Sequence, residues 1–371
     1  MPSRILIAGG GLAAQRAAET LRARGHDGAI QVICAEPVAP YDRPPLSKEL
    51  VGTPFRPAEW YADNDVELLL GRRACALDVG ARQVALDDGA VGYDALVIAT
   101  GSRPRRLPAL VGRPNVLELR TVADAERLRS ALTPGARLAI VGGGFVGLEV
   151  AATARRLGAD VTVIEAASAP LARVLGPSLG GWFAALHRAE GVRVEVGSGL
   201  EAALPAVAGA PVSALVLADG REIEADVVLS AVGVAPETRW LAGSPLAGDR
   251  VAVDPCGRTV VPGVWAAGDV VGGDHWEPAA RLGAAVARSI LGLDVGAAPP
   301  ASFWSDQYGI RIQLVGSAGA DVVEIDGSDR SFTAVLRRHG AVCGALLVGR
   351  PRELPTWRRR LADAATERKA A

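Results

Sequence analysis

The chain has 371 residues, of which 49% are hydrophobic and 22% are charged, as is typical of a globular protein with two or three domains. Its 40 basic and 41 acidic residues nearly cancel, so nucleic-acid binding through overall charge is not expected. No apolar run reaches the ~18 residues of a membrane span, and the opening apolar stretch is too short for a signal peptide, so we expect a cytoplasmic protein.

The first predicted element is a buried strand over Ile5–Ala8 that leads into a glycine-rich turn with the pattern G-x-G-x-x-A. Gly9 allows a tight turn, Gly11 lets the backbone approach a pyrophosphate, and Ala14 allows close packing of helix against strand. A helix is predicted from Gln15 to about residue 25, and its N-terminus would attract phosphate. A loop remains the alternative for a single glycine turn.

A second predicted strand supports a dinucleotide site. The strand covers Ile30–Cys34 and is followed by Glu36, about where an adenosine ribose needs a carboxylate. Glu36 taken alone is equally typical of a surface residue. Together, the strand, the turn, the helix and the acid favour dinucleotide binding.

The same pattern recurs about 130 residues later in the chain. A strand over Leu138–Val141 leads into Gly142, Gly144 and Gly147, a complete G-x-G-x-x-G, before a helix predicted over Leu148–Leu157. Two such turns indicate two dinucleotides. If one is a nicotinamide nucleotide, the simplest redox partner for it is a flavin.

The acid that follows the second turn favours NADH over NADPH. A strand over Val161–Ile164 ends at Glu165, which can accept both ribose hydroxyls of NADH but would repel the additional phosphate of NADPH. At ~4 Å and an effective dielectric constant near 20, each such charge pair costs about 4 kcal/mol before screening. The next residues, Ala166 to Ser168, provide no arginine to bind that phosphate.

Two further segments are predicted to be strands that end at tight turns. Tyr93–Gly101 precedes the second dinucleotide unit, and Val264–Asp269 has a similar composition. Asp269 is placed where a carboxylate could bond sugar-like hydroxyls. Each segment is also compatible with an ordinary buried strand and a capped turn.

Lysine is rare in this chain. Lys48 and Lys369 are the only lysines among the 40 basic residues, a bias that we attribute to a GC-rich genome. A lysine within Pro44–Lys48 therefore suggests a need for a compact ammonium group that can lose its proton, although chance remains the alternative.

The cysteines and histidines indicate neither a metal site nor thiol chemistry. Cys34, Cys75, Cys256 and Cys343 form no C-x-x-C pair, and the four histidines have no ligand spacing. We expect the cysteines to be buried as small hydrophobic residues.

Taken together, these features resemble the FAD-dependent pyridine nucleotide-disulfide oxidoreductases, and in particular the ferredoxin and rubredoxin reductases that serve bacterial cytochromes P450 and ring-hydroxylating dioxygenases. The resemblance runs from Arg4 to about Gly349. Its most specific strings are Tyr41–Lys48, His275–Trp276, Phe303–Tyr308 and Gln313–Gly316.

The resemblance implies an α/β fold with two interleaved Rossmann-like domains and a small α+β C-terminal domain. The implied FAD-binding domain covers residues 1–110 and 235–298, the NAD-binding domain 111–234, and the C-terminal domain 299–371.

The resemblance also implies which residues contact the cofactors. Those expected at FAD are Gly9, Gly11, Ala13, Ala14, Glu36, Arg43, Lys48, Ala74, Thr100, Gly101, Arg120, Asp269 and Trp276. Those expected at NADH are Gly142, Gly144, Val146, Gly147, Glu149, Glu165 and Gly233. Lys48 and Glu149 match a catalytic pair beside flavin N5, where they would stabilise developing charge. A solvated helix residue is the other interpretation of Glu149.

The implied mechanism has no role for a dithiol. The disulfide reductases carry their cysteine pair where this chain has Pro44–Lys48, so electrons would pass from NADH to FAD and then singly to a [2Fe-2S] ferredoxin.

Residues 335–371 carry nine basic and three acidic residues, which suggests a docking surface for an acidic ferredoxin or simply a solvated helix. A monomer or homodimer without nucleic-acid or membrane partners is expected.

Departures from the family pattern keep two other functions open. Pro278, Leu282, Glu237 and Ala169 replace the usual residues near the cofactors, and the C-terminal domain is short. Pro278 is compatible with the first position of a helix. The alternatives are an NADH oxidase or reductase of small diffusible acceptors, and an NADH-switched binding protein similar to the apoptosis-inducing factors.

Overall fold

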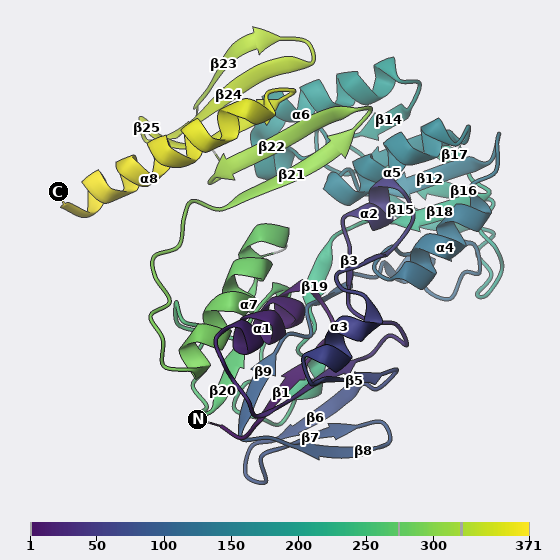
Figure 1. Cartoon of the computed structure of the whole chain (residues 1–371). Helices are drawn as coiled ribbons and strands as arrows, with labels where there is room; N and C mark the ends of the chain where they lie inside the picture. The colour runs from purple at the N-terminus through teal and green to yellow at the C-terminus, as the bar shows by residue number, and fades with distance from the viewer. Residues whose placement is uncertain (1, 274, 320–321, 371) are drawn as a thin grey trace. The chain divides into compact units, whose positions relative to one another are not determined.

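The computed structural model describes residues 2–273, 275–319 and 322–370 (Figure 1). The chain divides into two compact units, each assembled from segments that are far apart in the sequence. Unit 1 contains Met1–Arg43, Gly52–Arg103 and Val234–Ala297. Unit 2 contains Pro44–Val51, Pro104–Gly233 and Ala298–Ala371.

Unit 1 is built on a parallel sheet with the strand order β20-β9-β1-β2-β5. These strands are β1 (Arg4–Ala8), β2 (Ala29–Cys34), β5 (Val66–Leu70), β9 (Ala95–Ile98) and β20 (Val264–Ala266). The central strand β1 pairs Ile5 with Ile30 on one side and Ala95 on the other. Its apolar residues from Ile5 onward are fully buried, as expected for a parallel strand that is covered on both faces.

Helices cover one face of this sheet and a small antiparallel sheet covers the other. The helices are α1 (Leu12–Ala23), α3 (Ala58–Asp63) and α7 (Trp276–Ile290). The small sheet consists of β6 (Ala74–Asp78), β7 (Gln83–Leu86) and β8 (Gly89–Gly92), and a two-stranded sheet of β3 (Tyr41–Asp42) and β4 (Thr53–Pro54) lies elsewhere in the unit. α1 and α7 lie side by side (Figure 1) and share a core with the sheet through Ala17, Leu21 and Val286.

Unit 2 contains a second parallel sheet, with the order β11-β18-β12-β13-β14. Its strands are β11 (Val116–Leu117), β12 (Arg137–Val141), β13 (Asp160–Glu165), β14 (Arg193–Val196) and β18 (Val227–Ser230). The helices of this part are α4 (Val122–Ala131), α5 (Phe145–Arg156) and α6 (Ala172–Ala189). An antiparallel sheet follows, made of β15 (Leu200–Leu204), β16 (Ala214–Leu217) and β17 (Glu222–Glu224).

The short segment Pro44–Val51 belongs to unit 2, although both of its flanking segments belong to unit 1. It contains α2 (Pro45–Lys48), which packs against α5. Thr153 on α5 donates its hydroxyl to the carbonyl oxygens of Ser47 and Lys48 at 2.9 and 3.0 Å. α5 therefore satisfies carbonyl groups at the end of α2 and holds Lys48 in place.

The C-terminal part of unit 2 is an antiparallel sheet with one helix packed on it. The strand order is β21-β22-β25-β24-β23, and the helix is α8 (Leu354–Ala370). The strands are β21 (Ser302–Gln307), β22 (Ile310–Gly316), β23 (Val322–Ser328), β24 (Ser331–Arg338) and β25 (Ala341–Val348). Trp357 and Leu361 of α8 close a core with Val315, Ala345 and Leu347.

The remaining elements are short. β10 (Ser102–Pro104) and β19 (Val234–Pro236) pair where the chain leaves unit 1 and returns to it. The 3-10 helices are η1 (Pro108–Leu110), η2 (Arg239–Leu241), η3 (Asp269–Val271) and η4 (Pro351–Glu353). Among the described residues, we find no helix with the length and apolar character needed to cross a membrane.

Both predicted phosphate-binding helices begin earlier than the sequence suggests. α1 begins at Leu12, where Gln15 was predicted, and α5 begins at Phe145, where Leu148 was predicted. The middle glycine of each motif is the N-cap residue, so the last residues of the motif already form the first helical turn.

The prediction that all four cysteines are buried is wrong. Cys34 at the end of β2 is buried, whereas Cys75 is exposed and Cys256 and Cys343 are intermediate. Cys75 lies on β6 at a register shift between Ala74 and Ala76, where the burial pattern loses its alternation and Cys75 and Ala76 are both exposed. Burial raises the pKa of the Cys34 thiol to about 12. All four thiols are free.

Candidate functional site

The first glycine turn forms a cradle that fits a diphosphate. Gly9 has a φ of +126°, and a Cβ there would lie 2.1 Å from the carbonyl oxygen of Ala99. A Cβ on Gly11 would meet no atom within 4 Å, so a ligand can approach the backbone closely. No described side chain caps α1, and its first turn has no acidic residue. Its leading N–H groups and the positive end of the helix dipole remain available for phosphate.

Ala13 and Ala14 contribute through their small size. Both are buried at the start of α1. A Cβ on Gly283 of α7 would come within 2.3 Å of the carbonyl oxygen of Ala13, which shows how closely the two helices approach. The predicted contact of Ala13 with FAD stays a prediction.

Glu36 lies just after β2 and is held by two neighbouring side chains. Its carboxylate accepts hydrogen bonds from the Tyr41 hydroxyl at 2.6 Å and from the Arg43 guanidinium at 3.0 Å. The Arg43 guanidinium also lies 5.4 Å from the centre of the Tyr41 ring. A carboxylate has about four acceptor positions. Glu36 therefore retains acceptor capacity for ribose hydroxyls.

Most of the other residues predicted at FAD are also in unit 1. Asp269 at the start of η3 accepts a hydrogen bond from the Ser102 hydroxyl at 2.9 Å. Trp276 at the start of α7 donates its indole N–H to Asp42 at 2.7 Å. The remaining members are Ala74 at the start of β6 and, after β9, Thr100 and Gly101.

Arg120 and Lys48, also predicted at FAD, belong to unit 2 instead. The backbone N–H of Arg120 donates to Asp124 at 3.1 Å. Asp124 forms a capping box with Thr121 at the start of α4. Arg120 is thus fixed at the N-terminus of that helix.

The second glycine turn repeats the cradle in unit 2. A Cβ on Gly142 would lie 2.4 Å from the carbonyl oxygen of Ala231, and one on Gly147 would lie 2.3 Å from that of Gly142. Gly144 again has open space around its Cβ position. No described side chain caps α5, and Val146 in its first turn is 46% exposed. The turn is shaped for a second diphosphate.

Glu165, at the end of β13, is oriented by backbone groups alone. Its two carboxylate oxygens accept the N–H groups of Gly143 and Ala167, each at 2.8 Å. Within the described chain it forms no ion pair, so its negative charge remains to repel a phosphate on the ribose. Gly233, the last residue predicted at NADH, follows β18.

Lys48 and Glu149 form a buried ion pair in unit 2. The Lys48 ammonium lies 2.8 Å from Oε1 of Glu149, and the side chains are only 15% and 6% exposed. Lys48 projects from α2, and Glu149 from the second turn of α5, directly after the glycine motif. The structure thus brings together the two residues that the family resemblance implies as a catalytic pair; their catalytic role stays a prediction.

Two serine hydroxyls complete the surroundings of Glu149. Ser305 on β21 donates to Oε1 at 2.6 Å, and Ser47 donates to Oε2. Both serines are buried. The carboxylate therefore receives the Lys48 ammonium and two hydroxyl donors, as a buried charge requires.

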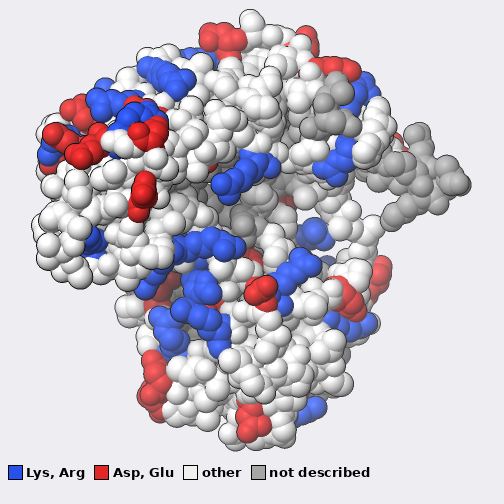
Figure 2. All heavy atoms as spheres, turned by 180° about the vertical axis from the view of Figure 1, so that it is seen from behind, with Lys and Arg blue, Asp and Glu red and all other residues white. Residues whose placement is uncertain are grey.

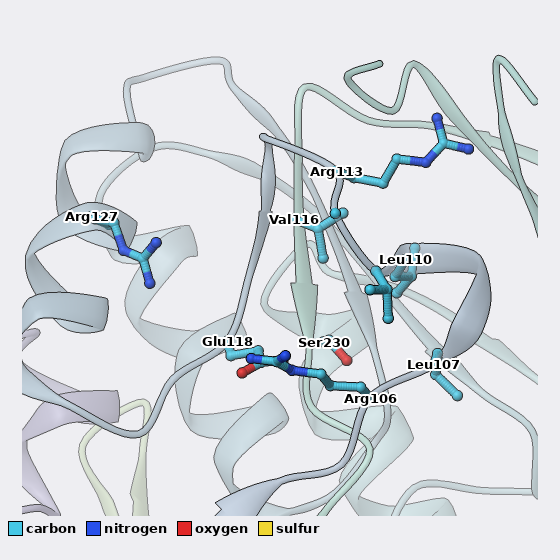
Figure 3. Close-up of a pocket in the computed structure, with 10 residues that line it drawn as sticks. Arg106, Leu107, Leu110, Arg113, Val116, Glu118, Arg127 and Ser230 are labelled. Atoms are coloured by element: carbon cyan, nitrogen blue, oxygen red, sulfur yellow. The ribbon is translucent and has the colours of Figure 1, made fainter. Parts of the chain in front are cut away.

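A separate pocket of about 200 Å³ lies in unit 2 (Figure 3). It includes none of the predicted cofactor residues. Its arginines are already engaged: Arg106 pairs with Glu118 at 2.9 Å, and Arg127 pairs with Asp124 at 2.5 Å. Arg113 donates to backbone carbonyl groups. The pocket therefore offers little free positive charge to an anion.

In the described part of the chain, no three His, Cys, Asp or Glu side chains are grouped so that they could hold a metal ion.

Comparison with known proteins identifies the family. Residues 3–283 match the pyridine nucleotide-disulphide oxidoreductase family, and residues 302–371 match the reductase C-terminal family. This chain belongs to the pyridine nucleotide-disulphide oxidoreductases. The predicted family, α/β fold class and oxidoreductase activity are thereby confirmed, as are FAD and NAD(H) as its cofactors.

Individual members of the family are similar over nearly the whole chain. The ferredoxin–NAD(+) reductase subunit of the benzene 1,2-dioxygenase system of Pseudomonas putida is 39% identical over 337 residues, covering 85% of this chain and 81% of that protein. The ferredoxin reductase component of a chlorobenzene dioxygenase from a Cupriavidus species is 39% identical, covering 95% and 91%. A chain in the covalent putidaredoxin reductase–putidaredoxin complex superposes with a TM-score of 0.93 at 31% identity, covering 97% and 93%.

The name of the family refers to disulfide chemistry, but α2 (Pro45–Lys48) of this chain contains no cysteine, and its four cysteines are all free. Pro278, which we considered for the first helical position, is instead the third residue of α7. The N–H groups of the first helical turn have no partner within the helix, so proline costs no hydrogen bond there.

Sequence reasoning missed the hydroxyl groups that hold Glu149. Ser47 and Ser305 lie within strings that carried the family resemblance, but no local pattern separates them from surface serines. Thr153 could have been found from the sequence, because residues four apart lie on the same helix face and Thr153 is four residues after Glu149 on α5. It holds the segment that carries Lys48 by donating to the carbonyl oxygens of Ser47 and Lys48.

Proposed function

We propose that this chain is an NADH-dependent, FAD-containing reductase that passes electrons singly to a ferredoxin-type iron–sulfur protein serving a cytochrome P450 or an oxygenase. The observation that carries the proposal is the buried Lys48–Glu149 pair beside a nicotinamide-type turn, in a chain that has no dithiol. The names of the relatives support the ferredoxin as acceptor.

FAD, when bound, would supply the chemistry of hydride and single-electron transfer. The chain's part is orientation and charge. The turns at Gly11 and Gly144 bind the two pyrophosphates, and Glu165 selects the unphosphorylated ribose. Lys48, held by Glu149, places a positive charge where negative charge develops during reduction.

The decisive experiment is anaerobic stopped-flow mixing with NADH, followed by mixing with an acidic [2Fe-2S] ferredoxin. Bleaching of flavin absorbance near ~450 nm, then rapid reoxidation by ferredoxin, is expected. Reduction without transfer to ferredoxin, but with fast reduction of oxygen or a quinone, would favour the small-acceptor reductase. Slow turnover with every acceptor would favour the NADH-switched binding protein.

A variant of the proposed catalytic pair tests the role of Lys48 within this reaction. Lys48→Ala is expected to slow flavin reduction by NADH at least tenfold, because the positive charge beside the reacting centre is lost. The fraction of bound FAD is expected to stay close to that of the wild type. A normal single-turnover rate would remove Lys48 from the catalytic role.

We further propose that the ferredoxin docks on basic residues around α8. Arg352, Arg359 and Arg360 are exposed and form no ion pair with a described acid. Trp357 and Leu361 on the same helix are buried against the sheet, so that face is not available. Figure 2 shows both basic and acidic side chains on the face that it presents, and the 40 basic and 41 acidic residues of the chain nearly cancel, so a local cluster, and not the overall charge, would steer the partner.

Fewer basic residues of the predicted segment 335–371 are unpaired than its charge count suggested. Arg337 pairs with Glu324, and Arg350 pairs with Asp326, each at 2.8 Å. The side chains of Arg368 and Lys369 lie outside the described residues.

A variant with two charges reversed, Arg359→Glu with Arg360→Glu, tests this docking surface. It is expected to slow electron transfer to ferredoxin while leaving flavin reduction by NADH unchanged. Equal ferredoxin rates in this variant and the wild type at low salt would place docking elsewhere.

A further inference from the structure

A continuous chain of buried hydrogen bonds runs to Glu149 from α6 and β21, all within unit 2. The Tyr308 hydroxyl lies 2.8 Å from Nδ1 of His187, and Nε2 of His187 lies 2.9 Å from Oε1 of Gln307. The Gln307 amide nitrogen donates to Ser305 at 3.0 Å, and Ser305 donates to Glu149 at 2.6 Å. His187 and Ser305 are 0% exposed and Gln307 is 1% exposed.

The carboxylate at the end sets the direction of every bond in this chain. An ionised carboxylate accepts only, so Ser305 uses its one proton on Glu149 and must accept from the Gln307 amide N–H. The Gln307 oxygen then faces His187 and requires a proton on Nε2. Burial lowers the pKa of His187 to about 4, so the ring is neutral near pH 7 and Nδ1 accepts from Tyr308.

The backbone at Tyr308 has a strained, left-handed conformation, which indicates that the position of its side chain is important. Tyr308 and Gly309 form the two-residue turn between β21 and β22, with φ values of 51° and 76°. Such a turn favours Asn and Gly, and a bulky residue in the left-handed region costs about 1–2 kcal/mol. The Tyr308 ring packs edge-on against His187, with centroids 5.1 Å apart. The strained residue, Tyr308, is therefore the one whose hydroxyl forms the first hydrogen bond of the series that ends at Glu149.

We propose that Gln307 and His187 are positioning residues that fix the Glu149 carboxylate, and through it the Lys48 ammonium, for the reduction step. This inference rests on the proposed reductase function. Oε1 of Glu149 is shared by Lys48 and Ser305, so the direction of the Ser305 hydroxyl sets the rotation of the carboxylate. Without the Gln307 amide, the Ser305 hydroxyl is no longer held in one orientation.

Two variants and one matched control test this. Gln307→Leu removes the amide at similar size, and Tyr308→Phe removes only the terminal hydroxyl. Thr333→Val is the control, because Thr333 is also buried in the C-terminal sheet and donates to Glu353 at 2.7 Å, away from the chain of bonds. For each FAD-loaded protein, stopped-flow mixing gives the limiting rate constant of flavin reduction and the apparent Kd for NADH. Nitrogen-15 NMR of the imidazole reports which nitrogen of His187 carries the proton.

We expect Gln307→Leu to lower the limiting rate constant about tenfold, Tyr308→Phe to lower it by about threefold, and the NADH Kd to change less than twofold in both. The wild-type ring should show a proton on Nε2, and Gln307→Leu should change that signal. The control should reduce at the wild-type rate.

Three outcomes would overturn the inference. They are an unchanged rate constant in both variants, an equal loss in the Thr333→Val control, and a wild-type ring with its proton on Nδ1. Failure of the wild type itself to be reduced by NADH would instead reject the proposed function, and the NMR result would then still decide whether the directed chain of bonds exists. If Gln307→Leu does not fold, Tyr308→Phe decides the kinetic question alone.

Discussion

Removing one charge of the Lys48–Glu149 pair should destabilise the protein more than any single surface change. In Glu149→Gln, the amide oxygen can keep the Oε1 position facing Lys48 and Ser305, while the amide nitrogen can donate to Ser47. The substitution therefore removes the negative charge and leaves the hydrogen bonds nearly satisfied. What remains is a lysine with 15% exposure and no counter-charge.

The distance gives the size of the effect. Two unit charges 2.8 Å apart attract each other by about 6 kcal/mol at an effective dielectric constant near 20. Part of this attraction offsets the cost of removing both groups from water, so the net loss on deleting one partner is about 3–5 kcal/mol. Lys48→Met should cost a similar amount, because it leaves the carboxylate buried without its cation.

The double variant measures how strongly the two charges of the pair stabilise each other. In Lys48→Met with Glu149→Gln, no charge is left buried, so the loss should be no greater than that of either single variant. Urea unfolding of the four FAD-loaded proteins, followed by tryptophan fluorescence, gives the coupling energy, which we expect to be about 3 kcal/mol. Additive losses in the double variant would refute the argument, because they would mean that the two charges do not interact.

Four other variants make separate predictions. His187 binds a proton less readily in the folded state, with a pKa of about 4, than in the unfolded chain, so stability should fall from about pH 6.5 downward. Between pH 7 and 5 the wild type should lose about 2 kcal/mol more than His187→Gln in urea unfolding, and equal losses would refute this. Glu165→Ala with Ser168→Arg should lower the NADH/NADPH ratio of kcat/KM at least tenfold, and an unchanged ratio would count against Glu165. Gly144→Ala should raise KM for NADH and cost at most about 1 kcal/mol of stability, because alanine is a poorer N-cap than glycine. Gly147→Ala should cost about 1–3 kcal/mol because its Cβ would meet a carbonyl oxygen at 2.3 Å.

The glycine turns were predictable because each motif and the acid after the next strand are close in sequence. Gly9 and Glu36 are 27 residues apart, and Gly142 and Glu165 are 23 residues apart. The carbonyl oxygens that crowd Gly9 and Gly142 belong to Ala99 and Ala231, far along the chain, so the sequence predicts the turn but not the contact that requires glycine. The helix starts were misplaced because a glycine N-cap leaves no side-chain signal at the boundary.

The surroundings of Glu149 could not be predicted in the same way. Ser47 and Ser305 lie 102 and 156 residues from Glu149 in the sequence. Their burial depends on the fold of unit 2, which brings α2, α5 and β21 together. The charge count along residues 335–371 likewise does not show which arginines are paired, since Glu324 and Asp326, which pair with Arg337 and Arg350, lie on β23, outside that segment.

The rarity of lysine was nevertheless an informative signal, and the structure gives a physical reason for it. The Lys48 ammonium points at one carboxylate oxygen, 2.8 Å away, and at the carbonyl oxygen of Pro44, 3.4 Å away. A planar guanidinium would require room for its five donors and would bind a carboxylate through two oxygens, but Oε2 of Glu149 is already occupied by Ser47. A compact cation with freely rotating donors fits this geometry, so a chain that otherwise uses arginine retains lysine at this position.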